Sequence, residues 1–243
     1  MKRGQATIFV IMGILIVALV TVSYSYRDEI SSKASEFGLV KTASLPPQFE
    51  NTKTEIENCL SDRLADATET IAIRGGFMEP TNALDANGLL ITYFYNKGNK
   101  FPPRERIAAE ISRVFNLDAV LCPTVADLEK PKMAESEVTI EESKIGAKIT
   151  MPVTLKIGET AETIKDFSIT PKISLGKLLD AAEQIIQTVN SEGICINCVN
   201  SIAEEKDIEA EIEPFENSVI ITLIDQNSKI NSKPLKLSFA VKY

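Results

Sequence analysis

An uncharged apolar run near the start of the chain constrains its fold more than any other feature. The run covers the 22 residues from Gln5 to Tyr26 and is dominated by Ile, Val and Leu. At about 1.5 Å per residue, a helix of this length measures roughly 33 Å, which is enough to cross a hydrocarbon core of about 30 Å. No face of such a helix is polar, whereas a surface helix of a soluble domain needs a polar face. The run therefore predicts one membrane-spanning helix.

The residues on either side of the run predict its orientation. Lys2 and Arg3 precede the run and are expected to stay in the cytoplasm, while Tyr24 and Tyr26 suit the opposite membrane interface. A cleaved secretory signal peptide has a shorter apolar core and an A-x-A-like site, and the segment V-T-V-S-Y-S-Y does not match that pattern. We therefore expect the helix to be retained and the C-terminal 217 residues to be extracellular.

The residues K-R-G-Q-A at positions 2–6 resemble the class III signal peptide of archaeal type IV pilins and archaellins. The resemblance covers about the first 25 residues. It implies that a prepilin-type peptidase cuts after Gly4 and leaves Gln5 as the mature N-terminus. It also implies that residues 5–26 first anchor the subunit in the membrane and then pack with other copies in a homopolymeric filament. The function implied is that of a pilin-like structural or adhesion subunit at the cell surface.

One position departs from the pilin-like pattern. Pilin-type helices often carry Glu at the fifth mature position, which corresponds here to Phe9. This departure keeps a second interpretation open, in which a single-span anchored ectodomain binds an envelope component or partner protein without polymerising. The K-R-G-Q opening, together with a Cys-bearing helix that ends in Gly-Gly, is also similar to surface proteins of small-genome archaea. That similarity implies a location and no activity.

The chain beyond residue 26 is expected to contain a stalk at 27–47 and a helical, Cys-bridged region at 48–130. Apolar residues at steps of three, four and seven predict a long helix that ends at Gly75-Gly76. Its expected core stripe consists of Phe49, Ile56, Leu60, Leu64, Ala67 and Ile71. A loop is expected at 77–88, a strand at 89–95 and a second helix at 104–115. A weak boundary follows near residues 127–134, where Lys, Glu and Pro cluster.

Residues 131–243 are expected to form an antiparallel sheet with a helix. Alternating apolar and polar residues predict strands at 138–140, 149–155, 164–169, 208–212, 219–224 and 235–241. Helices are expected at 175–190 and 195–206, and turns at Gly158-Glu159, Pro214 and Asn227-Ser228. The expected fold class is α+β, with amphipathic helices covering an antiparallel sheet.

Four cysteines lie beyond the apolar run, and an even number outside the membrane indicates disulfides. Cys195 and Cys198 are close enough to pair locally, which leaves Cys59 and Cys122 for each other. A second interpretation is a membrane-tethered thiol-disulfide oxidoreductase. If Cys195 opens a helix, the helix N-terminus lowers its thiol pKa and favours redox chemistry. A thioredoxin-like motif, however, follows a strand, whereas this one follows a helix and a glycine. A zinc site built from all four thiolates is the third interpretation.

Composition limits the remaining chemistry. The chain has no His, and its net charge of −8 argues against a nucleic-acid partner. The acidic clusters at 141–142, 204–207 and 209–213 lack a calcium-loop pattern, so we interpret them as solvated surface. Gly75-Gly76 lacks the residues of a phosphate loop. We therefore predict no catalytic residue, no cofactor and no metal site.

Overall fold

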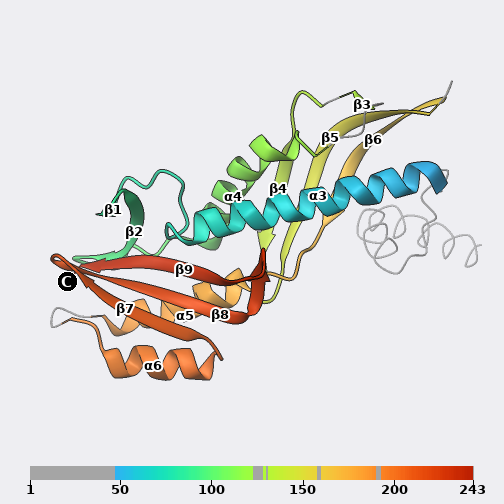
Figure 1. The fold of residues 1–243 in the computed structure, drawn as a ribbon. Helices are drawn as coiled ribbons and strands as arrows, with labels where there is room; N and C mark the ends of the chain where they lie inside the picture. The colour runs from blue at the N-terminus through green and yellow to red at the C-terminus, as the bar shows by residue number, and fades with distance from the viewer. Residues whose placement is uncertain (1–46, 123–127, 130, 158–159, 190–192, 243) are drawn as a thin grey trace, which may run out of the picture. The chain divides into compact units, whose positions relative to one another are not determined.

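The computed structural model describes residues 47–122, 128–129, 131–157, 160–189 and 193–242 (Figure 1). Its elements form a mixed α+β fold with a curled sheet, which confirms the predicted fold class at this level. Residues Phe49–Tyr243 form one compact unit. The predicted membrane helix at 5–26, the residues Gly4 and Gln5 and the stalk up to residue 46 lie outside the described residues. Within the described part, no helix is both long enough and apolar enough to cross a membrane.

Four helices occur among the described residues, close to the predicted positions. They are α3 (Pro47–Ala72), α4 (Arg104–Ala119), α5 (Leu175–Thr188) and α6 (Ile196–Glu205). The predicted stripe of α3 is confirmed, because every one of its six residues is buried. The helix ends where Gly75 and Gly76 adopt φ values of 71° and 93°, a conformation that glycine adopts without strain. The Gly76 N–H then donates to the carbonyl of Ile71 at 2.9 Å and completes the last turn.

One sheet has five strands in the order β1-β2-β9-β8-β7. These strands are β1 (Ala83–Ala86), β2 (Leu89–Asn96), β7 (Glu209–Phe215), β8 (Ser218–Ile230) and β9 (Lys233–Lys242). β7, β8 and β9 form an antiparallel meander. β2 pairs with β9 in parallel, which differs from the purely antiparallel sheet predicted. No hairpin joins these two strands, so no tight turn forces them to run antiparallel. Phe94 of β2 stacks on Phe239 of β9 with ring centroids 4.7 Å apart.

The second sheet is centred on β5 (Ile145–Ile157). β6 (Thr160–Ile169) pairs with one edge of β5, and β4 (Glu135–Ile140) and β3 (Leu128–Glu129) pair with the other edge, all antiparallel. Buried residues alternate along β5, as in a sheet with one solvated face; they are Ile145, Ala147, Ile149, Met151, Val153 and Leu155. The Oγ of Ser112 in α4 donates to the carbonyl of Ser136 in β4 at 2.8 Å. This contact joins the two regions on either side of residues 127–134; their division into separate domains stays a prediction.

Three predictions about loops and turns were wrong. The expected loop at 77–88 contains β1, which forms a hairpin with β2 through Asn87 and Gly88 at φ 55° and 90°. The strand β8 continues through the expected turn at Asn227-Ser228, because a bulge between Asp225 and Lys229 absorbs the irregularity. The real turn uses Asn231 and Ser232, at φ 50° and 66°, which suits a two-residue hairpin. Pro214 likewise lies inside β7 and not in a turn. The turn expected at Gly158-Glu159 lies outside the described residues.

Candidate functional site

The structure forms the two predicted disulfides, Cys59–Cys122 and Cys195–Cys198. Their Cα atoms are 5.6 Å and 5.2 Å apart, within the usual range for a disulfide. All four cysteines are therefore paired. In this form none of them offers a thiolate to zinc, so the chemistry open to these residues is that of disulfides.

The disulfide Cys59–Cys122 joins α3 to the segment that follows α4. Its two residues are 63 positions apart in the sequence. In the chain-entropy model, closing a loop of this size stabilises the fold by about 4 kcal/mol. Cys122 is only 4% exposed, so this sulfur is poorly reachable from solvent. Both observations indicate a structural cross-link.

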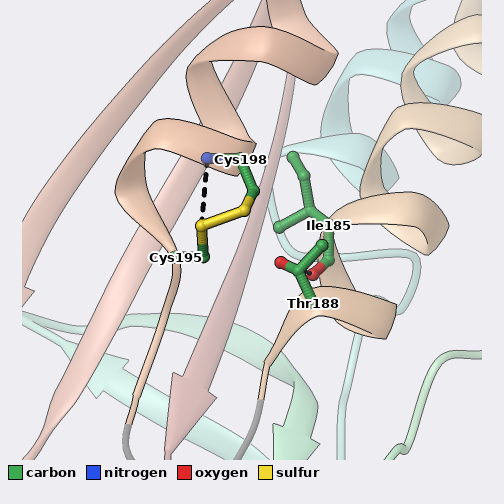
Figure 2. The surroundings of a disulfide bond; sticks show 4 residues. All are labelled: Ile185, Thr188, Cys195 and Cys198. Carbon is green, nitrogen blue, oxygen red and sulfur yellow. Dashed lines mark hydrogen bonds between the residues drawn. A yellow bond between two sulfur atoms is a disulfide. The ribbon is translucent and has the colours of Figure 1, made fainter.

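The disulfide Cys195–Cys198 lies at the N-terminus of α6 (Figure 2). Cys195 is the N-cap residue, with φ −76° and ψ 93°, and its Sγ accepts a hydrogen bond from the N–H of Cys198 at 3.2 Å. Cys195 therefore opens a helix, which is the position at which redox chemistry is favoured. As predicted, the motif follows a helix and a glycine, because α5 and Gly193 precede it. Gly193 has φ 128°, which an L side chain rarely adopts.

Apolar packing holds α6 in place. Val199 and Ala203 are buried, lie four residues apart and therefore share one face of the helix, which packs against α5 and β7. Ile185 and Thr188, in the last turns of α5, lie beside the disulfide (Figure 2). The hydroxyl of Thr188 donates to the carbonyl of Ile185 at 2.8 Å, so α5 itself satisfies that polar group. The packing of Val199 and Ala203 thus holds α6 against its neighbours in addition to the disulfide.

The opposite side of the disulfide faces solvent. Ile196, between the two cysteines, is 57% exposed, and Asn197 is exposed as well. Cys195 and Cys198 themselves are half-buried. Because only three positions separate the cysteines, this bridge stabilises the fold by about 2 kcal/mol in the same entropy model, roughly half as much as the long bridge. The short disulfide therefore joins two half-buried cysteines, and the entropy model gives it the smaller stabilisation of the two.

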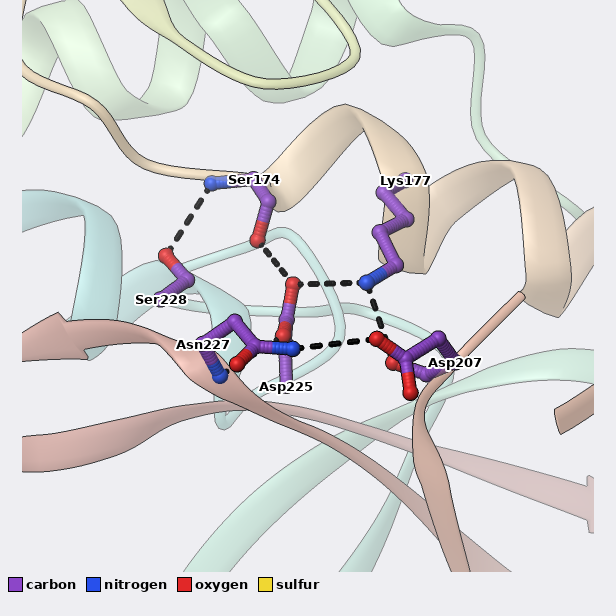
Figure 3. Close-up of polar contacts among 6 residues, drawn as sticks. All are labelled: Ser174, Lys177, Asp207, Asp225, Asn227 and Ser228. Atoms are coloured by element: carbon purple, nitrogen blue, oxygen red, sulfur yellow. Dashed lines mark hydrogen bonds and ion pairs between the residues drawn. The ribbon is translucent and has the colours of Figure 1, made fainter. Parts of the chain in front are cut away.

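A buried polar cluster around the N-terminus of α5 was not predicted from the sequence. It centres on Asp225, which is 1% exposed although it lies in β8 (Figure 3). Its carboxylate accepts hydrogen bonds from Ser174 Oγ at 2.5 Å, the N–H of Asn227 at 3.0 Å and Lys177 Nζ at 3.1 Å. Burial alone raises the pKa of Asp225, but the hydrogen bonds from Ser174, Asn227 and Lys177 outweigh burial and hold the pKa below its ordinary value of 3.8. The carboxylate therefore stays ionised.

The rest of this cluster connects α5 to its neighbours. The Oγ of Ser228 accepts from the N–H of Ser174 at 3.1 Å, and Lys177 Nζ also donates to the carbonyl of Asp207 at 3.0 Å. Asn227 Nδ2 donates to Asp207 Oδ2 at 3.1 Å. A carboxylate with a lowered pKa is a weak base, so it does not activate the Ser174 hydroxyl as a nucleophile. We interpret the cluster as the attachment of the α5 N-terminus to β8, and not as a reactive site.

The acidic clusters behave as the sequence predicted. Glu209, Glu211 and Glu213 are exposed along β7, and the side chains at 141–142 and 204–205 are exposed too. Within the described residues, no three carboxylates or thiols are grouped so that they could hold a metal ion. Among the described residues that the sequence singled out, Cys195 and Cys198 come together as a disulfide between two half-buried cysteines at the N-terminus of α6.

Comparison of the chain with protein-family models, with curated proteins and with solved structures found no match.

Proposed function

We propose that this protein is an extracytoplasmic cell-surface protein, anchored through residues 5–26 and acting as a pilin-like structural or adhesion subunit. The single observation that carries the proposal is the long disulfide between Cys59 and Cys122. Disulfides persist in oxidising compartments, whereas the cytosol of most cells keeps thiols reduced. This bridge supports the extracellular orientation expected from Lys2 and Arg3.

The surface chemistry of the described unit is consistent with such a location. Exposed carboxylates line β7 and the β4–β5 turn, and the whole chain carries a net charge of −8. A net negative charge keeps protein molecules apart and soluble when they are displayed at high density. It also disfavours binding to nucleic acid, whose phosphates require clustered cations.

The pilin-like part of the proposal rests on the residues around Gly4. Cleavage between Gly4 and Gln5 by a prepilin-type peptidase removes Lys2 and Arg3 from the helix end. Two charges buried in an apolar filament core are costly unless each finds a partner or water. Once they are removed, the helices at residues 5–26 are free to exchange lipid contacts for contacts with copies of themselves. Gly13 and Ala18 permit close approach of neighbouring helices.

The second candidate is an anchored ectodomain that does not polymerise. The observation that favours it is Phe9, which stands where many pilin-type helices carry Glu. In that case residues 5–26 remain a single membrane span, and the unit beyond residue 48 binds an envelope component or a partner protein.

Mass spectrometry of the mature N-terminus separates the two candidates. The pilin-like proposal expects Gln5 as the first residue, and a Gly4→Leu variant should retain residues 1–4. Protease added to intact cells should remove the region beyond Arg27. Negative-stain images of the cell surface should then show filaments that disappear in the Gly4→Leu variant.

The outcomes are distinct. An intact Met1 or Lys2 on surface-exposed protein rejects the processing and supports the anchored ectodomain. A Gln5 terminus without filaments keeps the processing, rejects polymerisation and points to Phe9 as the cause of the missing assembly. Complete protection from the protease rejects surface exposure itself.

A further inference from the structure

We propose that Cys195–Cys198 is a thiol-disulfide exchange site that oxidises a dithiol in an apolar segment of a partner polypeptide. This activity is additional to the surface role proposed above and does not depend on filament formation. It uses a group that the structure holds in its oxidised form, at the N-terminus of α6.

The first argument is the electrostatic position of Cys195. As the N-cap of a ten-residue helix, its sulfur faces the positive end of the helix dipole. The N–H of Cys198 already donates to this sulfur at 3.2 Å in the disulfide. The same N–H and dipole stabilise a thiolate on Cys195 once the bond opens. Cys195 is therefore the better leaving sulfur at the end of the reaction.

The second argument is access. In the long bridge Cys122 is buried and Cys59 is half-buried. In the short bridge both cysteines are half-buried, and the exposed Ile196 lies between them. The exposed side chain of Ile196, between the two cysteines, offers an apolar contact to a substrate segment. A segment of an unfolded or partly folded protein has this chemistry, because it displays apolar side chains and reduced cysteines together.

The exchange balances in two steps. A substrate thiolate attacks the Sγ of Cys195, a mixed disulfide forms, and the sulfur of Cys198 leaves as a thiolate that takes up a proton. The second substrate thiolate then attacks the substrate sulfur of the mixed disulfide, and Cys195 leaves as a thiolate. The substrate loses two electrons and gains a disulfide, while the protein gains two electrons and becomes a dithiol. A low-molecular-mass disulfide returns the dithiol to the oxidised form by the reverse exchange.

The seating of α6 allows this cycle to occur without unfolding. Val199 and Ala203 are buried, and α6 packs against α5 and β7 through residues that do not belong to the disulfide. The bridge closes a loop of only three positions, so opening it releases little chain entropy.

The test uses the full-length chain, purified in detergent, and dithiothreitol under native conditions. Alkylation followed by peptide mapping measures the reduction of each bridge. We expect Cys195–Cys198 to open at least about tenfold faster than Cys59–Cys122, which serves as an internal control. Equal rates, or faster opening of Cys59–Cys122, overturn the proposal.

Trapping experiments assign the roles. In a Cys198→Ser variant, oxidised glutathione should form a mixed disulfide on Cys195. With Cys195→Ser, Cys198 should form it about tenfold more slowly, because its sulfur lacks the N-cap position. Equal trapping at the two positions overturns the assignment.

An Ile196→Ser variant tests the substrate class. The probes are two synthetic dithiol peptides of equal length, one with apolar and one with polar flanking residues. The wild type should oxidise the apolar peptide several-fold faster than the polar one, and Ile196→Ser should remove this preference. A preference that survives in Ile196→Ser contradicts the docking role, and failure of the wild type to oxidise either peptide rejects the activity.

Discussion

Ser174 Oγ donates a hydrogen bond of 2.5 Å to Asp225 Oδ2, and this contact joins the beginning of α5 to β8 across 51 sequence positions. Lys177, one turn further along α5, donates to the same oxygen at 3.1 Å. The buried carboxylate thus accepts hydrogen bonds from the N-cap and from the first turn of one helix. Removing one partner of a buried ion pair destabilises a protein strongly, because the other charge is left buried and unpaired.

The substitution Asp225→Asn should destabilise the protein by about 3 kcal/mol, because it leaves the ammonium of Lys177 without its buried counter-charge. Urea unfolding monitored by circular dichroism provides the measurement. Glu211→Gln on the exposed face of β7 is the matched control and should change the free energy of unfolding by less than about 0.5 kcal/mol. Equal effects of the two substitutions would show that the Asp225 cluster contributes no more to the free energy of unfolding than an exposed carboxylate does.

The stability that Asp225 contributes should depend on pH in one direction. Its pKa is lowered in the folded state, so the unfolded state binds the proton more readily. The contribution is therefore complete at neutral pH, begins to fall near the ordinary value of 3.8 and is lost as the pH drops through the lower folded pKa. Urea midpoints of the wild type and Asp225→Asn, measured between pH 7 and 3, should converge below about pH 4. A constant difference down to pH 3 would contradict this assignment.

The two disulfides should differ in their effect on stability. Removing the long bridge with Cys59→Ala and Cys122→Ala together should cost about 4 kcal/mol, since it frees a loop that spans 63 positions. Removing the short bridge with Cys195→Ser and Cys198→Ala should cost about 2 kcal/mol, and the hydroxyl introduced at position 195 still provides an oxygen to cap α6. Thermal unfolding of both double variants under the same conditions makes the comparison. A larger loss from the short bridge would reverse our ranking of structural and reactive disulfides.

The substitution Gly76→Ala should be more harmful than Gly88→Ala, although both glycines have positive φ values of 93° and 90°. A Cβ on Gly76 would lie 2.9 Å from Cγ1 of the buried Ile107, whereas nothing lies within 4 Å of a Cβ on Gly88. Gly88→Ala should therefore cost about 1 kcal/mol for backbone strain alone, and Gly76→Ala about 3 kcal/mol for strain and overpacking together. Chemical denaturation measures both, and similar losses would indicate that Ile107 moves aside freely.

Much of the local structure was predictable because its cause lies within a few neighbouring residues. The stripe from Phe49 to Ile71 repeats with helical spacing, and each of its members is buried in α3. The positions of α4 and α5 followed from the same periodicity. The Asn87-Gly88 dipeptide was also a usable hairpin signal, and its omission explains why β1 was missed.

The disulfide pairing was predictable for a similar reason. Cys195 and Cys198 are so close in sequence that a local bridge is geometrically simple, and the other pair follows. The sequence also located the Cys195–Cys198 pair and set the condition for redox chemistry, that Cys195 must open a helix, which the structure meets.

Tertiary structure decided what depends on distant segments. The parallel pairing of β2 with β9 and the contact of Asp225 with Ser174 each join residues that no local period relates. The seating of Cys195 as the N-cap of α6 likewise depends on how Val199 and Ala203 pack against α5 and β7. The amino-acid sequence by itself determined the helices, the alternating strands and the cysteine partners, because these follow from short-range periodicity and chain proximity. Strand direction, the ionised buried carboxylate and the exposure of one disulfide were decided only by the fold, because burial and long-range pairing set their energies.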